Sequence, residues 1–216
     1  MSKGHPLLYE VNTRVLLRER AQALGRPVTL DDLGDDLLDR VSEEGFDWMW
    51  LLGVWQTGPV GRSISRGEKA WRASFEAALP DLREEDIGGS PFAVRSYRAD
   101  ADLGGEEALR RTRDRLARRG LRLMLDFVPN HTARDHAWVL HHPEYYIHGT
   151  EADRERDPGG YASVTALDGV EHILAHGRDP YFPGWIDTFQ LNYRHARLRA
   201  AISSSKIFSF SSSTAA

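Results

Sequence analysis

Three apolar segments, separated by segments of helical periodicity, dominate the first half of the chain. Leu7 to Leu17 is rich in Leu, Tyr and Val and predicts a first strand. Phe46 to Trp55 is almost continuously apolar and aromatic, which favours a parallel strand buried on both faces. Leu121 to Val128 predicts a third strand, which ends at Pro129 because proline cannot donate a ladder hydrogen bond.

Amphipathic helices are predicted between these strands. Thr29, with Asp32 three residues on, resembles a capping box before leucines at helical spacing that run to Val41. A short helix is expected over Trp71 to Leu79, and a clearer one over Glu106 to Arg119. The order strand, helix, strand, helix, strand predicts an α/β fold with right-handed βαβ units and a parallel sheet.

The second half of the chain is less regular. From Thr132 to about Trp185 it is polar, rich in Gly, His, Tyr and Pro, and predicts no clear secondary structure, as in a functional insertion or a small subdomain. Asp187 to Ala201 predicts an extended entry into a helix. Ile202 to Ala216 holds seven serines and no arginine, which indicates either a disordered polar tail or translation in the wrong frame; we favour the second.

Composition narrows the class of protein. The net charge of −4 offers no basic footprint for nucleic acid, and no apolar run approaches the roughly 18 residues that span a bilayer. The absence of cysteine excludes disulfides and thiolate metal sites. The N-terminus has no apolar stretch typical of a signal peptide, so we expect a cytoplasmic protein that binds neither nucleic acid nor membrane.

Polar residues at the end of the third predicted strand are the first candidates for a site. Asp126 to His131 reads Asp-Phe-Val-Pro-Asn-His, and ligands bind at the C-terminal ends of strands in parallel α/β folds. Alternation places Arg122, Met124 and Asp126 on one face, and a carboxylate there needs a cationic or hydrogen-bonding partner. From spacing alone, Asp126 can equally be a paired structural acid and His131 a turn residue.

The same segment resembles the first signature region of the α-amylase family, glycoside hydrolase family 13, which runs Asp, three residues, Asn, His after barrel strand three. Other segments agree in order with that family: Leu8 to Asn12, Ser90 to Val94 with Tyr97 and Leu103-Gly104-Gly105, and Gln190 to Tyr193. The resemblance implies a partial (β/α)₈ barrel with its first three βα units and a domain B-like insertion after strand three. The implied domains are 1–131 (barrel), 132–186 (insertion), 187–201 (return to a barrel helix) and 202–216 (tail).

The resemblance also implies roles for individual residues. His131 matches the histidine that hydrogen-bonds the sugar in subsite minus one, and Phe92 lies where members place a stacking tyrosine. Asp126 matches an acid that pairs with an arginine on strand four, and Tyr97 supports the site from the segment before the third βα unit. Asn130 matches a position that helps hold calcium in many members. The implied ligand is an α-glucan or an oligosaccharide.

The catalytic carboxylates of the family have no match in this sequence. A retaining glycosidase needs two carboxylates beside the scissile bond, and the family supplies them after strands four and five. We therefore expect a retaining α-glucosidic enzyme in an intact parent and no activity in this chain alone. One alternative is a non-catalytic carbohydrate- or partner-binding fragment. Another is a zinc hydrolase built on the histidines between His131 and His176.

Overall fold

The computed structural model describes residues 4–204, and the chain divides into two units that are each described separately. The first unit comprises Met1–Gln56 and Arg98–Phe127, and the second comprises Thr57–Tyr97 and Val128–Ala216. The chain passes from one unit to the other within β3 (Trp55–Thr57), within β4 (Val94–Ala99) and after Phe127. The residues 205–216 of the predicted tail lie outside the described part of the chain.

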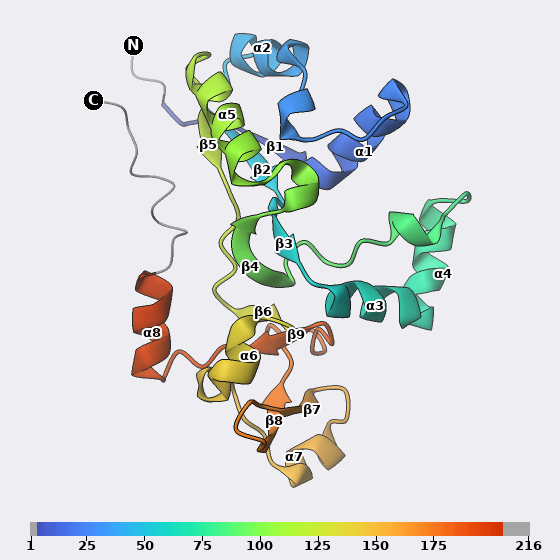
Figure 1. The fold of residues 1–216 in the computed structure, drawn as a ribbon, viewed down its shortest axis with the longest axis vertical. Helices are drawn as coiled ribbons and strands as arrows, with labels where there is room; N and C mark the ends of the chain where they lie inside the picture. Colours follow the sequence, from blue (N-terminus) through green and yellow to red (C-terminus); the bar gives the residue numbers. More distant parts are fainter. Residues whose placement is uncertain (1–3, 205–216) are drawn as a thin grey trace. The chain divides into compact units, whose positions relative to one another are not determined.

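The first unit is built on a parallel sheet with the strand order β1-β2-β5 (Figure 1). Its elements are β1 (Leu8–Asn12), α1 (Thr13–Leu24), η1 (Leu30–Asp32), α2 (Asp35–Glu43), β2 (Trp48–Leu52), η3 (Ala101–Leu103), α5 (Gly105–Ala117) and β5 (Arg122–Met124). Helices follow β1 and precede β5, so the predicted alternation of strands and helices in a mixed α/β fold is confirmed.

The predicted second strand is interrupted. β2 ends at Leu52, and the chain turns at Gly53, whose φ of 82° favours glycine, before β3 begins at Trp55. Met49 and Leu51 are completely buried within β2. Trp55 is also buried, as expected for a core residue rather than a sugar platform. The prediction of one strand over Phe46 to Trp55 was therefore wrong at its C-terminal end.

The predicted first strand also ends early. Residues 13 to 17 form the start of α1, because the side chain of Asn12 accepts a hydrogen bond from Val15 N at 3.3 Å and caps the helix. Gly25, with a φ of 64°, ends that helix. The leucines and the valine of residues 13 to 17 favour a strand when they are considered alone. In the structure they belong to a helix, in which Leu17 is buried.

The predicted capping box at Thr29 is confirmed. Its hydroxyl accepts from Asp31 N at 3.3 Å, and its N–H donates to Asp32 at 2.8 Å. The capped element is the short η1, and α2 begins only at Asp35. The predicted helix over Glu106 to Arg119 is observed as α5 within two residues at its C-terminal end, with Leu109 and Leu116 fully buried.

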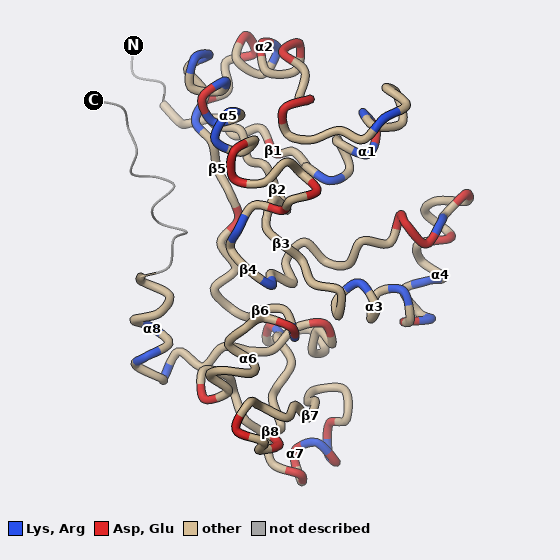
Figure 2. Tube along the Cα trace, in the orientation of Figure 1, with Lys and Arg blue, Asp and Glu red and all other residues tan. Residues whose placement is uncertain are grey.

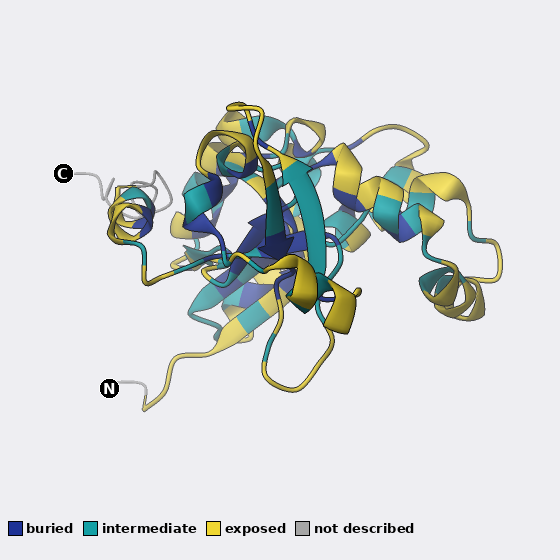
Figure 3. Cartoon of the chain, turned by 90° about the horizontal axis from the view of Figure 1, so that it is seen from below, coloured by how far each residue is buried: buried dark blue, intermediate teal, exposed yellow. Residues whose placement is uncertain are grey.

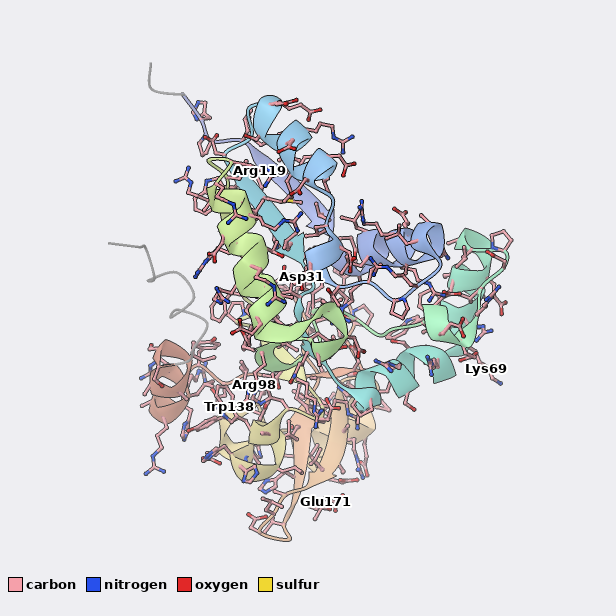
Figure 4. The ribbon with its side chains drawn as sticks, turned by 45° about the horizontal axis from the view of Figure 1, so that its top comes forward. Asp31, Lys69, Arg98, Arg119, Trp138 and Glu171 are labelled. Carbon is pink, nitrogen blue, oxygen red and sulfur yellow. The ribbon has the colours of Figure 1, made fainter. Side chains whose placement is uncertain are left out.

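Ion pairs join α5 to η1 and α2. Arg111 and Arg115 lie four residues apart on α5, and Arg119 follows four residues later, just beyond the end of the helix at Ala117. Figure 2 shows the charged residues of these elements, and Figure 4 labels Asp31 and Arg119. Arg111 contacts Asp31 with two N–H groups at 2.7 and 2.8 Å. Arg115 and Arg119 both contact Asp35 at 2.9 Å. The three arginines therefore link α5 and the turn after it to η1 and α2 through ion pairs.

Replacing Arg111 with alanine is expected to have a small, salt-dependent effect. Both partners are largely solvent-exposed, so the pair contributes little to stability and salt screens it. Thermal unfolding at low and at molar salt measures the difference, with the exposed Arg118→Ala as control. A loss that persists undiminished at high salt would show that Arg111 acts through packing instead.

The second unit contains two antiparallel strand pairs, β6-β9 and β7-β8. Its elements are α3 (Pro59–Gly67), α4 (Lys69–Ala78), η2 (Glu84–Asp86), β6 (His131–Ala133), α6 (Ala137–His141), η4 (Pro143–Tyr145), α7 (Glu151–Arg156), β7 (Tyr161–Thr165), β8 (Glu171–Ala175), β9 (Thr188–Gln190) and α8 (Ala196–Ser203). A core cluster that includes Tyr146, Leu174, Phe189 and Leu198 joins these strands to α8, and buried residues gather in the strands (Figure 3).

The segment from Thr132 to Trp185 is more regular than predicted. It contains the β7–β8 hairpin, in which Tyr161 pairs with Ala175, and the strand β6, which pairs with β9 almost 60 residues later. The prediction of no clear secondary structure was wrong for this part of the chain. Its buried residues Val139, Tyr145, Tyr146 and Leu174 share one core cluster with residues of β9 and α8. The helix predicted near Ala201 is observed as α8. Among the described residues, no helix is long and apolar enough to cross a membrane.

Candidate functional site

A pocket of about 840 Å³ lies within the second unit. One side is apolar and comes from α4 and the segment after it, including Trp71, Phe75 and Leu79. The other side carries His131 and Asp187, both of which are buried. A pocket with apolar walls and a few converging polar groups is the usual form of a small-molecule site.

His131 lies at the polar side of this pocket as the first residue of β6. Its side chain is 7% exposed, and burial lowers its pKa to about 4, so the ring is neutral near pH 7. The ring of Trp185 lies 5.1 Å away, centroid to centroid, at a tilt of 59°. A neutral imidazole offers one donor and one acceptor, which suits recognition of sugar hydroxyls.

Phe92 lines the same pocket and is 40% exposed. Its backbone forms a hydrogen bond with His131, which partly offsets the effect of burial on the histidine pKa. The structure therefore brings together the two residues that the sequence predicted as substrate-binding, although they lie 39 positions apart. The phenyl ring presents an apolar face without the hydroxyl of a tyrosine.

Tyr97 supports the segment that leads to His131. Its hydroxyl accepts a hydrogen bond from Val128 N at 2.9 Å and donates one to Val128 O at 3.1 Å. These two bonds fasten β4 to the chain three residues before His131. A supporting role for Tyr97 agrees with this geometry, because the side chain touches backbone rather than the pocket.

Asp126 lies in the first unit, beyond the end of β5 at Met124. Its carboxylate accepts hydrogen bonds from Trp50 Nε1 at 2.9 Å and from Gly53 N at 2.6 Å, and its backbone carbonyl accepts one from Trp55 Nε1 at 2.9 Å. Burial raises the pKa of Asp126, while these donors act in the opposite direction. The structure thus supplies hydrogen-bond donors as the expected partners of this buried acid.

Asn130 is committed to hydrogen bonds within the second unit. Its Oδ1 accepts from Gln190 Nε2 at 2.7 Å, and its Nδ2 donates to Arg178 O at 3.3 Å. A calcium ion at Oδ1 would compete with the bond from Gln190 for the lone pairs of that oxygen. In the described part of the chain no group of three histidine, aspartate or glutamate side chains gathers as metal ligands. Asn130 therefore has no cluster of carboxylates beside it to share a calcium ion.

The histidines between His131 and His176 serve several separate contacts. His136 caps α6 by accepting from Trp138 N at 3.1 Å. His148 contacts Pro143 O at 3.0 Å, and His176 contacts Thr188 O at 2.9 Å. The described residues thus use their histidines in capping and packing, and the zinc alternative receives no ligand set from them.

Three residues of the site were missed by the sequence analysis. Trp185 contacts the His131 ring, and Asp187 is a buried acid in the pocket wall whose pKa is raised by burial. Gly177 lies so close that a Cβ atom there would meet His131 Cβ at 2.7 Å and Thr188 Oγ1 at 2.6 Å. Their approach to His131 depends on the β6–β9 pairing, which no local pattern indicates.

Gly177→Ala is therefore expected to displace His131. The added methyl group cannot be accommodated without a shift of β6 or β9, because strand residues rather than a flexible side-chain end surround it. Changed amide chemical shifts of His131 and Thr188 would measure the displacement, and Gly159→Ala, where a Cβ meets nothing within 4 Å, is the control. Unchanged shifts at His131 would contradict the close contact.

Comparison with known protein families gives a match for the segment that carries Asn130 and His131. Residues 93–163 match the family described as alpha amylase, catalytic domain. No curated protein matches the chain. Similar solved structures include an alpha-amylase from Lactobacillus plantarum, at 22% identity and a TM-score of 0.55, over 91% of this chain and 34% of that protein.

Two further structures show the same partial overlap. A trehalose-6-phosphate hydrolase from Bacillus licheniformis has a TM-score of 0.58 at 15% identity, over 95% of this chain and 33% of that protein. An isomaltulose synthase variant from Erwinia rhapontici NX5, in complex with its natural substrate sucrose, has a TM-score of 0.53 at 17% identity. The match covers 91% of this chain and 31% of that protein.

The chain spans about a third of the length of the solved structures that it resembles, and identities this low show the fold alone. The fold is mixed α/β and matches part of their catalytic domains, and the described residues form an open sheet rather than a closed barrel. The family match covers β4, β5, β6 and the segment that carries Asn130 and His131. Residues 93–163 of this chain are therefore similar to part of the alpha-amylase catalytic domain family.

Proposed function

We propose that this chain carries the sugar-binding part of an alpha-amylase-type site and binds an α-glucosyl unit without hydrolysing it. The observation that carries the proposal is the buried, neutral His131, which faces a pocket beside Phe92 and Trp185. His131 contributes a hydrogen bond to sugar hydroxyls, and the two aromatic rings contribute apolar faces for the sugar ring. Sucrose bound to the isomaltulose synthase is an α-glucoside, which supports this ligand class.

In fold, we infer that β1, β2 and β5 correspond to the first three strands of a (β/α)₈ barrel. Their parallel order β1-β2-β5 and the intervening helices agree with consecutive βα units. The segment 132–186 then corresponds to an insertion after the third barrel strand, and 187–201 to the return into a barrel helix. A closed barrel takes eight strands, and this chain covers about a third of the solved structures that it resembles.

Hydrolysis requires groups that the resemblance does not transfer to this chain. A retaining glycosidase uses one carboxylate as nucleophile and another as general acid, on either side of the scissile bond. Asp126 alone does not supply such a pair, and its oxygens already accept hydrogen bonds from Trp50 and Gly53. We therefore propose that an intact parent is a retaining α-glucosidic hydrolase or transglycosylase and that this chain supplies only part of its site.

His131→Ala is expected to abolish oligosaccharide binding. The change removes the ring hydrogen bond from the pocket wall, and we expect a loss of at least tenfold in affinity. Isothermal titration with maltotriose measures the binding, and His141→Ala, at an exposed position of α6, is the matched control. Equal affinity in His131→Ala and the wild type would place the sugar elsewhere.

A turnover assay separates binding from catalysis. The wild-type chain is expected to bind maltotriose and to release no product from it or from an aryl α-glucoside, because two flanking carboxylates are required. Product formation at a rate that His131→Ala lowers would contradict the non-catalytic part of the proposal and would identify a catalytic pair within this chain.

A further inference from the structure

The side chain of Gln190 forms one end of a hydrogen-bond chain that leads to His131. Gln190 is the last residue of β9 and lies directly opposite His131 in the β6–β9 register. Its Oε1 accepts from Arg178 N at 3.0 Å. Its Nε2 donates to Asn130 O at 3.0 Å and to Asn130 Oδ1 at 2.7 Å.

Backbone groups determine which way this amide points. A backbone N–H can only donate, so the atom of Gln190 that faces Arg178 N must be the oxygen. A backbone carbonyl can only accept, so the atom that faces Asn130 O must be the nitrogen. Gln190 therefore has a single orientation, and its Nε2 must donate to Asn130 Oδ1.

The same argument fixes Asn130. Its Oδ1 receives the bond from Gln190, and its Nδ2 donates to the carbonyl of Arg178 at 3.3 Å. The backbone of Arg178 thus holds both amides, one by its N–H and the other by its carbonyl. Asn130 Nδ2 also lies 3.2 Å from His131 Nδ1, and it can only donate there.

His131 must consequently accept at Nδ1 and carry its proton on Nε2. The remaining N–H is then the only donor of the neutral ring, and the hydrogen bond to the Phe92 backbone uses a histidine donor. We propose that Gln190 is a positioning residue that sets the tautomer of His131 through Asn130, with no metal ion in the chain of contacts. The proposal rests on the proposed sugar-binding function in one respect: because Nδ1 accepts from Asn130, a sugar oxygen at His131 would share the Nε2–H with the Phe92 backbone.

A metal-free arrangement follows from the same contacts. Asn130 Oδ1 is the one side-chain atom of this group that calcium would prefer, and it already accepts at 2.7 Å. Gln190 can donate to that oxygen, whereas a carboxylate at the same position could not. The amide of Gln190 thus competes with a cation for this oxygen.

Gln190→Glu tests the orientation directly. Glutamate keeps the shape and the acceptor for Arg178 N but cannot donate to Asn130. The Asn130 amide then turns its Nδ2 to the carboxylate and its Oδ1 to His131, which requires a proton on Nδ1. Correlation of the ring nitrogens with the ring protons by NMR distinguishes the two tautomers, with His131 assigned from the resonances that are missing in His131→Asn.

The expected result is the Nε2–H tautomer in the wild type and the Nδ1–H tautomer in Gln190→Glu. Gln190→Met, whose side chain has neither the amide donor nor the amide acceptor, is expected to give a mixture of the two His131 tautomers. This variant replaces Gln190→Glu in the test if the glutamate variant does not fold. Gln22→Glu, at an exposed position of α1, controls for the added charge. An Nδ1–H tautomer in the wild type, or no change in either Gln190 variant, overturns the proposal.

Two further measurements separate this inference from the proposed function. Maltotriose affinity is expected to fall about tenfold in Gln190→Glu, as for the loss of one well-placed hydrogen bond. If the wild type binds no maltotriose but the tautomer switches, the proposed function fails and the positioning role stands. The thermal midpoint of the wild type is expected to be unchanged by millimolar calcium chloride, and a rise would overturn the metal-free part.

Discussion

Replacing Asp126 with alanine is expected to lower the free energy of unfolding of the first unit by about 2–4 kcal/mol. The change leaves two donors, the buried Gly53 N and the partly buried Trp50 Nε1, without their acceptor. Each unsatisfied buried donor costs about 1–3 kcal/mol, while relief from burying the carboxylate offsets part of the loss. Hydrogen exchange of the β2 amides measures this unit separately.

An asparagine variant tests whether a single acceptor oxygen at residue 126 can satisfy the two donors. Asp126→Asn keeps one acceptor oxygen but presents an NH₂ group to the other donor, so we expect a loss close to that of alanine. Asp102→Ala, at an exposed position of η3, is the control and is expected to change the exchange of β2 by less than about 0.5 kcal/mol. A loss of similar size in the control would show that β2 responds to charge in general rather than to these hydrogen bonds.

Lowering the pH from 7.5 to 5 is expected to destabilise the second unit by about 2 kcal/mol for each of His131 and His136. Burial lowers the pKa of both residues to about 4, from an ordinary value of 6.5. Below pH 6.5 these two histidines are protonated in the unfolded chain but stay neutral in the folded chain. The free energy of unfolding therefore falls as the pH is lowered to about 4, and it is constant above pH 7.5. Protonation of His136 at Nδ1 would also break its bond from Trp138 N.

Urea unfolding of His136→Asn at the two pH values tests this. Asparagine keeps an acceptor for Trp138 N but cannot be protonated, so the difference between pH 7.5 and pH 5 should shrink by about 2 kcal/mol. His141→Asn makes the same change at an exposed position and should leave the difference intact. The raised pKa of Asp187 acts in the opposite direction as the pH falls, so the comparison between variants is decisive rather than the absolute slope. An unchanged difference in His136→Asn would contradict the assignment.

The elements predicted correctly from the sequence are those whose signals are local. Thr29 and Asp32 stand three residues apart, and Leu109 and Leu116 repeat within a single helix. The boundary at Asn12 was missed because the apolar residues on either side suit a strand and a helix equally well, and one capping side chain decides between them. Local periodicity therefore predicted the kinds of element better than their ends.

The site was predictable in part for the same reason. His131 was found because it follows the end of an apolar segment, and Phe92 because it lies in a recognisable run before the third unit. Trp185, Asp187 and Gln190 reach His131 through an antiparallel pairing of strands almost 60 residues apart, whose ends carry no mutual signal in the sequence. Contacts across such a distance are set by the tertiary fold, and a single sequence does not reveal them.

The division of each unit into two separate stretches of chain has a consequence for biosynthesis. The segment 57–97 leaves the ribosome before its partners from residue 128 onward exist, while the first unit is completed by β5 in between. At about 5–20 residues per second, the apolar face of α4 waits on the order of ten seconds for His131, Trp185 and Thr188 to complete the pocket wall. During that interval the apolar residues of α4 lack the contacts that His131, Trp185 and Thr188 supply to the pocket in the folded chain.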